Sequence, residues 1–227
     1  MNEEALTDRR LTTPRAAAVA GILFAVLIVV AYVLIRQAIP MDPADQNAAW
    51  LREQTGTVSL ALGLVPFAGI AFLWFIGVVR DRIGEYEDRL FASVFFGSGL
   101  LYLALTFAAA AVTTGLLTSF AVDADKLVES GLYLYVRALI WQILNVYAIR
   151  MASVFMISLG TIWVRTLVMP RWLAFLTYIS ALVLLFTVTY NVWVTMVFPA
   201  WVLVISVYIL YVNLRGGSIN PENQNNL

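Results

Sequence analysis

The stretch that decides the fold is Ala16–Ile35, which reads AAAVAGILFAVLIVVAYVLI and lies between Arg15 and Arg36. A helix that crosses the hydrocarbon core of a bilayer, about 30 Å thick, needs about 20 apolar residues, so this stretch is long enough to span a membrane. The chain is 62% hydrophobic and holds further stretches of the same kind. Because only helices or closed barrels satisfy the backbone inside lipid, the sequence predicts an all-α, polytopic transmembrane helical bundle.

Charged residues at the borders of these stretches divide the chain into about six crossings. We expect a single bundle over residues 1–215, followed by a disordered polar tail over residues 216–227 that is rich in asparagine. The predicted crossings cover residues 16–35, 57–79, 91–120, 145–164, 172–189 and 193–214.

The fourth crossing belongs to an unusually long apolar region, residues 127–164. As one straight helix this region would be about 57 Å long, against about 30 Å for the hydrocarbon core. Residues 145–164 make the best crossing. Residues 127–144 are therefore expected either to project beyond the membrane or to lie along its outer surface.

The distribution of basic residues predicts the orientation. Connections rich in arginine alternate with connections poor in it, and the positive-inside rule then places both termini in the cytoplasm of a cell whose plasma membrane holds the protein. The arginine-rich segments contain Arg9, Arg10 and Arg15, then Arg80, Arg82 and Arg89, then Arg165 and Arg171, and finally Arg215.

Tryptophan placement agrees with this orientation, because tryptophan side chains favour membrane interfaces. We expect Trp74, Trp163 and Trp172 at the inner interface, and Trp141, Trp193 and Trp201 at the outer interface.

The residue types that are missing exclude several chemistries. The chain has no histidine and no cysteine, which excludes imidazole triads, disulfides, His-ligated haem and most zinc or copper sites. None of the predicted crossings contains a carboxylate, the usual group of an intramembrane proton relay. The net charge is zero and no basic run is long enough for nucleic acid. We therefore expect no catalytic site, cofactor or metal, and no nucleic-acid partner.

Arg150 is the charged residue that needs an explanation, because it lies within the fourth crossing and no acidic residue of a crossing can pair with it. At 100° per residue, Gln142, Arg150 and Ser153 share a polar side of the helix. They form the predicted ligand-binding site, with Arg150 holding an anionic group through paired hydrogen bonds. In the alternative interpretation, Arg150 reaches toward the outer headgroups or caps neighbouring carbonyls, since it is only about 8 Å below the outer boundary. Arg137 lies beyond the hydrocarbon core and needs no such account.

Small residues in the first three crossings predict close helix packing, which is how membrane helices associate without a hydrophobic driving force between them. The residues concerned are Ala17, Gly21, Gly63, Gly69, Gly97, Gly99 and Gly115.

Several segments resemble a group of uncharacterised, actinobacterial-type multi-pass membrane proteins of unknown function. The similarity would cover most of the chain and implies a bacterial six-helix membrane protein, but no activity. The segments are RMASVFMIS at 150–158, RT at 165–166, PRWLA at 170–174, VPFAGIAFLWFIG at 65–77 and RDR at 80–82.

Two classes of function remain open. The first is a non-enzymatic binding or accessory bundle that holds a lipid, an apolar or amphiphilic ligand, another membrane protein or a second copy of itself. The second is a transporter or channel for an anionic or amphiphilic solute that uses Arg150 as its charge anchor. The lack of an intramembrane carboxylate and of a visible inverted repeat favours the first class.

The orientation can be tested with reporter fusions. Fusions after residues 45 and 125 should be external, and fusions after residue 85 and at the C-terminus should be internal, because the arginine-rich connections stay in the cytoplasm. An external C-terminus would show that the crossings have been miscounted.

Overall fold

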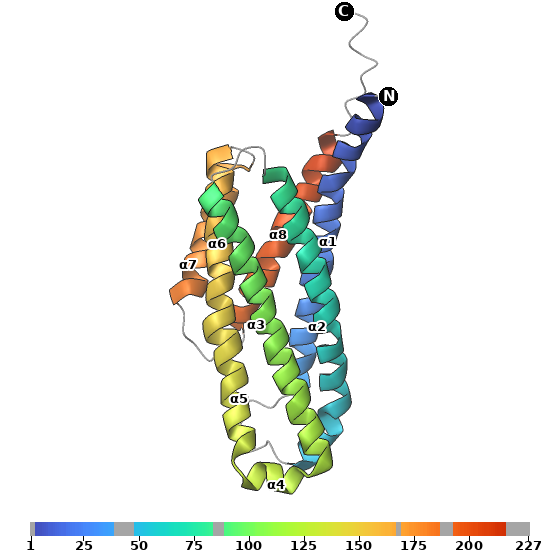
Figure 1. Cartoon of the computed structure of the whole chain (residues 1–227), viewed down its shortest axis with the longest axis vertical. Coiled ribbons are helices and arrows are strands. Elements are labelled where there is room, and N and C mark those ends of the chain that lie inside the picture. The colour runs from blue at the N-terminus through green and yellow to red at the C-terminus, as the bar shows by residue number, and fades with distance from the viewer. Residues whose placement is uncertain (1–2, 39–47, 84–88, 167–168, 187–192, 217–227) are drawn as a thin grey trace, which may run out of the picture.

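The computed structural model describes residues 3–38, 48–83, 89–166, 169–186 and 193–216. These residues form helices joined by short turns, with no strand among them (Figure 1). The all-α class is confirmed. The long helices are α1 (Glu3–Ala38), α2 (Ala48–Ile83), α3 (Arg89–Val122), α6 (Ile149–Thr166), α7 (Arg171–Phe186) and α8 (Trp193–Gly216), and the shorter elements are α4 (Ala124–Glu129), α5 (Leu132–Gln142) and the π-helix η2 (Ile143–Ala148).

The helices run side by side along one long axis. Helix α1 begins and α8 ends at the same end of the bundle, which we call the terminal end, whereas α4 lies across the opposite end, which we call the α4 end (Figure 1). Five helical segments are long and apolar enough to cross a membrane, and α7 is a shorter apolar helix of 16 residues. The structure is therefore that of a bundle compatible with a multi-pass integral membrane protein.

Helices α5, η2 and α6 form one continuous rod, of which Leu132–Arg165 is a single apolar span. Figure 1 shows α5 continuing the line of α6 toward α4, so residues 132–142 do not lie across the bundle as a surface helix would. A rod of this length reaches about 50 Å, well beyond a hydrocarbon core of about 30 Å. The structure therefore shows residues 132–142 continuing the rod along the bundle, and their projection beyond the membrane stays a prediction.

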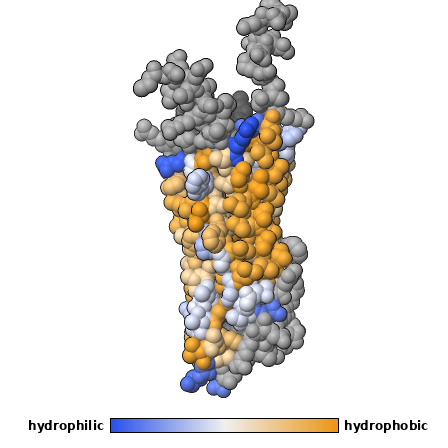
Figure 2. All heavy atoms as spheres, turned by 90° about the vertical axis from the view of Figure 1, so that its right-hand side faces the viewer, coloured by the Kyte–Doolittle hydropathy of each residue, from blue (hydrophilic) through white to orange (hydrophobic). Residues whose placement is uncertain are grey.

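The exposed side chains mark where the apolar band stops. In α2, large apolar side chains face outward from Leu60 onward, whereas Gly56 and Ser59 occupy exposed positions before it. From Leu60 to Arg80 is about 30 Å along the helix, the thickness of the hydrocarbon core. In α3, the exposed positions between Phe107 and Phe120 are small or carry hydroxyls, and exposed Ala121 and Val122 follow at the end of the helix. The positions between are Ala108, Ala111, Thr114, Gly115, Thr118 and Ser119. Figure 2 shows the same change from an orange surface to a paler one toward the α4 end.

The core is built around aromatic rings. Phe72 of α2 is fully buried, and its ring centroid lies 4.6 Å from that of Phe24 in α1 and 5.6 Å from that of Tyr102 in α3. It also lies 5.5 Å from the ring of Phe155 in α6 and 5.7 Å from that of Phe198 in α8. Tilted and edge-to-face pairs of this kind add to the packing free energy. One ring therefore joins five helices at a single level of the bundle.

The close packing predicted from small residues is observed at three glycines. A Cβ atom at Gly21 would collide with side chains of α2 and α8, one at Gly69 with side chains of α3, and one at Gly99 with Ile76 of α2 and Phe155 of α6. The same prediction is wrong for three other glycines, where a Cβ atom would meet nothing within 4 Å. These are Gly63, Gly97 and Gly115.

Two tryptophans expected at the membrane interfaces belong to the core instead. Trp163 and Trp201 are buried, and their ring centroids are 6.0 Å apart. The indole N–H of Trp201 donates a hydrogen bond of 2.9 Å to the hydroxyl of Thr177 in α7. A buried indole needs such an acceptor, and Thr177 supplies it inside the bundle. Trp74 and Trp172 are exposed, and their position at an interface stays a prediction.

Replacing Phe72 by alanine tests the aromatic core. Phe72→Ala should lower the free energy of unfolding by about 3 kcal/mol, because it removes ring contacts to four helices and leaves a cavity that the neighbouring rings cannot fill. Phe67→Ala is the matched control, since Phe67 lies on the same helix and is 64% exposed. It should change the stability by only about 0.5 kcal/mol. Thermal unfolding in lipid nanodiscs would measure both, and equal losses would contradict the assignment of Phe72 to the core.

Candidate functional site

Arg150 occupies the start of α6, and its side chain turns back along the helix toward the α4 end. Its Nη1 donates a hydrogen bond of 2.7 Å to the backbone carbonyl of Val146. The side chain is half-buried. A helical side chain naturally points toward its own helix N-terminus, which for this rod is the α4 end. The side chain of Arg150 thus caps the backbone carbonyl of Val146.

The other two residues of the predicted polar side lie in different surroundings. Ser153 is fully buried, and its hydroxyl donates a hydrogen bond of 2.7 Å to the carbonyl of Arg150. Gln142 is exposed at the end of α5. The structure therefore joins Ser153 to Arg150 through the backbone and places Gln142 on the surface. Anion binding by these three residues stays a prediction.

The segment between Gln142 and Arg150 is a π-helix, Ile143–Ala148. Its geometry is visible in the hydrogen bond from the N–H of Ile149 to the carbonyl of Leu144, five residues earlier. Short π segments inside α-helices are rare and occur often at functional sites. This one lies within the apolar span Leu132–Arg165, just before Arg150.

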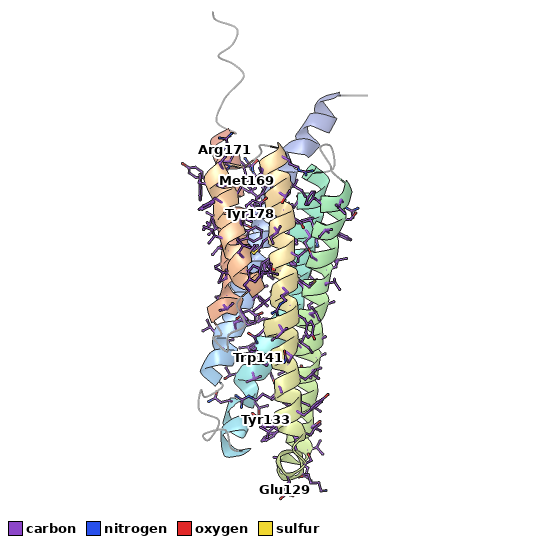
Figure 3. The ribbon with its side chains drawn as sticks, turned by 90° about the vertical axis from the view of Figure 1, so that its left-hand side faces the viewer. Glu129, Tyr133, Trp141, Met169, Arg171 and Tyr178 are labelled. Atoms are coloured by element: carbon purple, nitrogen blue, oxygen red, sulfur yellow. The ribbon has the colours of Figure 1, made fainter. Side chains whose placement is uncertain are left out.

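A partly enclosed cavity of about 170 Å³ lies between α1, α2, α3 and the α5–η2 part of the rod. It lies toward the α4 end, where α7 and α8 do not reach (Figure 1). Tyr133, which Figure 3 shows near the α4 end, belongs to its wall. The lining residues are Ile28, Ala31, Tyr32 and Ile35 of α1; Val58, Leu62 and Val65 of α2; Thr106, Ala109, Ala110, Thr113, Leu116 and Leu117 of α3; and Tyr133, Arg137, Ile140 and Leu144 of the rod.

The wall of the cavity is almost entirely aliphatic, because its hydroxyl groups are engaged elsewhere. Thr106 donates a hydrogen bond of 2.8 Å to the carbonyl of Tyr102, and Thr113 donates one of 2.7 Å to the carbonyl of Ala109. The hydroxyl of Tyr32 is hydrogen-bonded to that of Tyr102. These groups therefore present mainly carbon to the cavity, and an apolar occupant would displace no essential hydrogen bond.

Volume limits what the cavity can hold. A cavity of about 150 Å³ lined by aliphatic and aromatic side chains stays dry and can hold a molecule of the size of benzene. Whole drug-sized ligands need about 300 Å³ or more. This cavity thus has room for an apolar group, or for part of a single hydrocarbon chain, and not for a complete phospholipid.

Sequence reasoning passed over Arg137, which the structure places in the cavity wall. The signal was present in the spacing of Tyr133, Arg137, Ile140 and Leu144, which recur every three or four residues and so share one face of a helix. That spacing shows that the four residues lie together. It gives no sign that their shared face borders a cavity.

Metal binding finds no support among the described residues, where no three of the histidine, cysteine, aspartate and glutamate side chains are grouped for an ion. The chain matches no family model, no curated protein and no solved structure. What the fold defines is a class, namely an apolar all-α bundle compatible with a multi-pass membrane protein.

Substitutions at Arg150 distinguish capping from anion recognition. Arg150→Ala should lower the free energy of unfolding by about 1–2 kcal/mol, because the Val146 carbonyl loses a charged donor. Arg150→Lys should retain most of this stability, since a carbonyl accepts from any cationic donor, and Gln142→Ala should leave it unchanged. Unfolding measured in nanodiscs would test the series. A full loss with lysine would indicate that the planar guanidinium itself is needed, as anion recognition requires.

Proposed function

We propose that the protein is a non-enzymatic binding or accessory bundle of a bacterial plasma membrane, with both termini in the cytoplasm. Its ligand is a lipid or another apolar molecule, part of which occupies the cavity between α1, α2, α3 and α5–η2. The source proposed for it is the group of actinobacterial-type membrane proteins that the sequence resembles.

The observation that carries this proposal is the combination of an aliphatic wall with a few polar groups at its edge. A well-formed apolar pocket with a small number of convergent polar side chains is the usual form of a small-molecule site. Ala31, Ala109 and Ala110 contribute to the empty space, because their side chains are short where the facing helices carry larger ones. The cavity is thus built into the sequence of α1 and α3.

The arginines support the orientation. Arg80, Arg165 and Arg171 lie at or near helix ends at the terminal end, where Figure 3 shows Arg171, and Arg15 lies in the N-terminal half of α1. Two of them lie over aromatic rings, with Arg80 over Phe96 at 4.6 Å and Arg165 over Phe91 at 4.8 Å. Under the positive-inside rule, this end would face the cytoplasm, and the cavity would lie in the outer half of the bundle.

The composition supports a role without catalysis. A general acid or base of ordinary kind would have to be a tyrosine, Lys126 or a carboxylate outside the crossings. A transporter that used Arg150 as an anchor would need its guanidinium turned to a solute pathway. The observed hydrogen bond to Val146 gives that alternative no support.

Filling the cavity tests the proposal. Native mass spectrometry of the gently extracted protein should reveal a bound lipid or apolar molecule, and Ala110→Leu should abolish it, because the added carbons occupy the space between α3 and the rod. Unfolding temperatures measured on the same samples would confirm that the variant is folded.

Ala108→Leu provides the matched control, since Ala108 lies on the same turn of α3 but faces outward. This variant should keep the bound molecule. Identical adducts on the native protein and on the folded Ala110→Leu variant would overturn the proposal.

A further inference from the structure

The cavity has two chemically different ends. Along the rod its lining runs from Leu144 to Tyr133, and along α3 from Thr106 to Leu117, each about 16 Å. At the inner end, Ile28, Val65 and Leu144 lie within or next to the apolar band. At the other end, Tyr133 packs against the buried cluster that contains Leu117 and Phe120, beyond the level at which the exposed positions of α3 turn small and polar.

The position of this level relative to the membrane follows from α2 and α3. Large exposed apolar side chains begin at Leu60 in α2, and in α3 small or hydroxyl-bearing residues take the exposed positions from Ala108 to Ser119, before Val122 at the end of the helix. Val58, Thr113 and Leu117 lie on the α4 side of these points, whereas Leu62, Val65 and Thr106 lie on the other side. If this level is taken as the outer edge of the hydrocarbon core, the cavity extends from the core into the headgroup layer, which is about 5–7 Å thick.

The volume of the cavity selects the kind of chain. A volume of about 170 Å³ holds one benzene-sized group when it is compact. By the same comparison it holds about six or seven carbons of one hydrocarbon chain, and it has no room for two chains. A phospholipid with two chains could insert at most one of them.

Arg137 is the charged member of the lining, and it belongs to the part nearer the α4 end. It lies one helical turn, about 6 Å, from Tyr133 in the direction of Leu144. A guanidinium offers a planar fork of donors that suits phosphate and carboxylate groups. An amphiphile has a charged headgroup at one end and an apolar chain at the other. The position of Arg137 at this end of the aliphatic cavity matches that arrangement, with the headgroup outside the cavity and the chain inside it.

We propose that the cavity binds the single hydrocarbon chain of an anionic amphiphile from the leaflet at the α4 end, with Arg137 contacting its phosphate or carboxylate group. This proposal rests on the proposed function, which it deepens by naming the class of ligand and the residue that recognises the ligand's negative charge. The chain extends past Ala110 and Ile140 toward Leu144, and the headgroup stays at the membrane surface. Arg137 acts as a specificity residue, because the aliphatic wall by itself would accept a chain with any headgroup.

The test uses the full chain in phosphatidylcholine nanodiscs and three probes with the same chain: dodecyl phosphate, dodecanoate and dodecyltrimethylammonium. Native mass spectrometry would measure the occupancy of a one-to-one complex during titration. The two anionic probes should bind about tenfold more tightly than the cationic one, since a hydrogen-bonded charge contact favours them. A preference for only one of the two anions would tell a phosphate ligand from a carboxylate ligand, and either result supports the proposal.

Variants of the protein test which residues contact the headgroup of the ligand and which contact its chain. Arg137→Gln should remove the preference for anionic probes, whereas Lys126→Gln, at an exposed residue outside the cavity, should keep it. Thr113→Leu should prevent the binding of all three probes, because the larger side chain fills the cavity. Thr114→Leu is its matched control, because both threonines donate to the carbonyl four residues earlier while Thr114 faces outward.

Equal affinity of the native protein for the anionic and cationic probes would overturn this proposal, and that comparison needs no variant to fold. Probes that bind equally to the native protein and to folded Thr113→Leu would also overturn it, since they would occupy some other place. If no probe binds but the native protein retains a co-extracted molecule that Ala110→Leu removes, this proposal fails and the proposed function stands. If no probe binds and the native protein retains no co-extracted molecule, both this proposal and the proposed function fail.

Discussion

The arrangement of the whole bundle depends on the packing of Phe72. Lipid chains are as apolar as the side chains they would replace, so membrane helices gain little from burial itself and associate through shape and close contact. Phe72 supplies such contact to rings on four other helices, at centroid separations between 4.6 and 5.7 Å. The close approaches at Gly21, Gly69 and Gly99 serve the same packing, because larger residues there would push the helices and their rings apart.

The cavity is the counterpart of this aromatic core. Helices α1, α2, α3 and the rod form both, but the core receives Phe24, Phe72, Tyr102 and Phe155 from them, whereas the cavity receives mainly alanine, valine, leucine and isoleucine. Helices α7 and α8 are shorter and contribute no residue to the lining. Four long helices held together at one level, with short side chains facing each other farther along, leave unfilled space between them. In this way a packed core and a cavity coexist in one bundle.

Arg150 illustrates how a charge can be tolerated within a crossing. The π-helix before Arg150 has a backbone carbonyl, that of Val146, within reach of the guanidinium. The guanidinium donates a hydrogen bond to this carbonyl rather than facing lipid. Arg137, 13 residues or about 20 Å farther toward the α4 end, differs from it in lying on the cavity wall. The two arginines of the rod thus have separate surroundings.

The sequence by itself determined the all-α class, the long apolar segments and the exclusion of imidazole and thiolate chemistry. It could do so because lipid forces every crossing to satisfy its backbone within its own helix, so that length and hydropathy decide the local structure. Only the tertiary structure decided which glycines pack closely, that Trp163 and Trp201 are core residues, and that Tyr133 and Arg137 border a cavity. The physical reason is that these features depend on which faces of separate helices meet. The cavity draws on four segments, residues 28–35, 58–65, 106–117 and 133–144, whose mutual rotation and height no local pattern specifies.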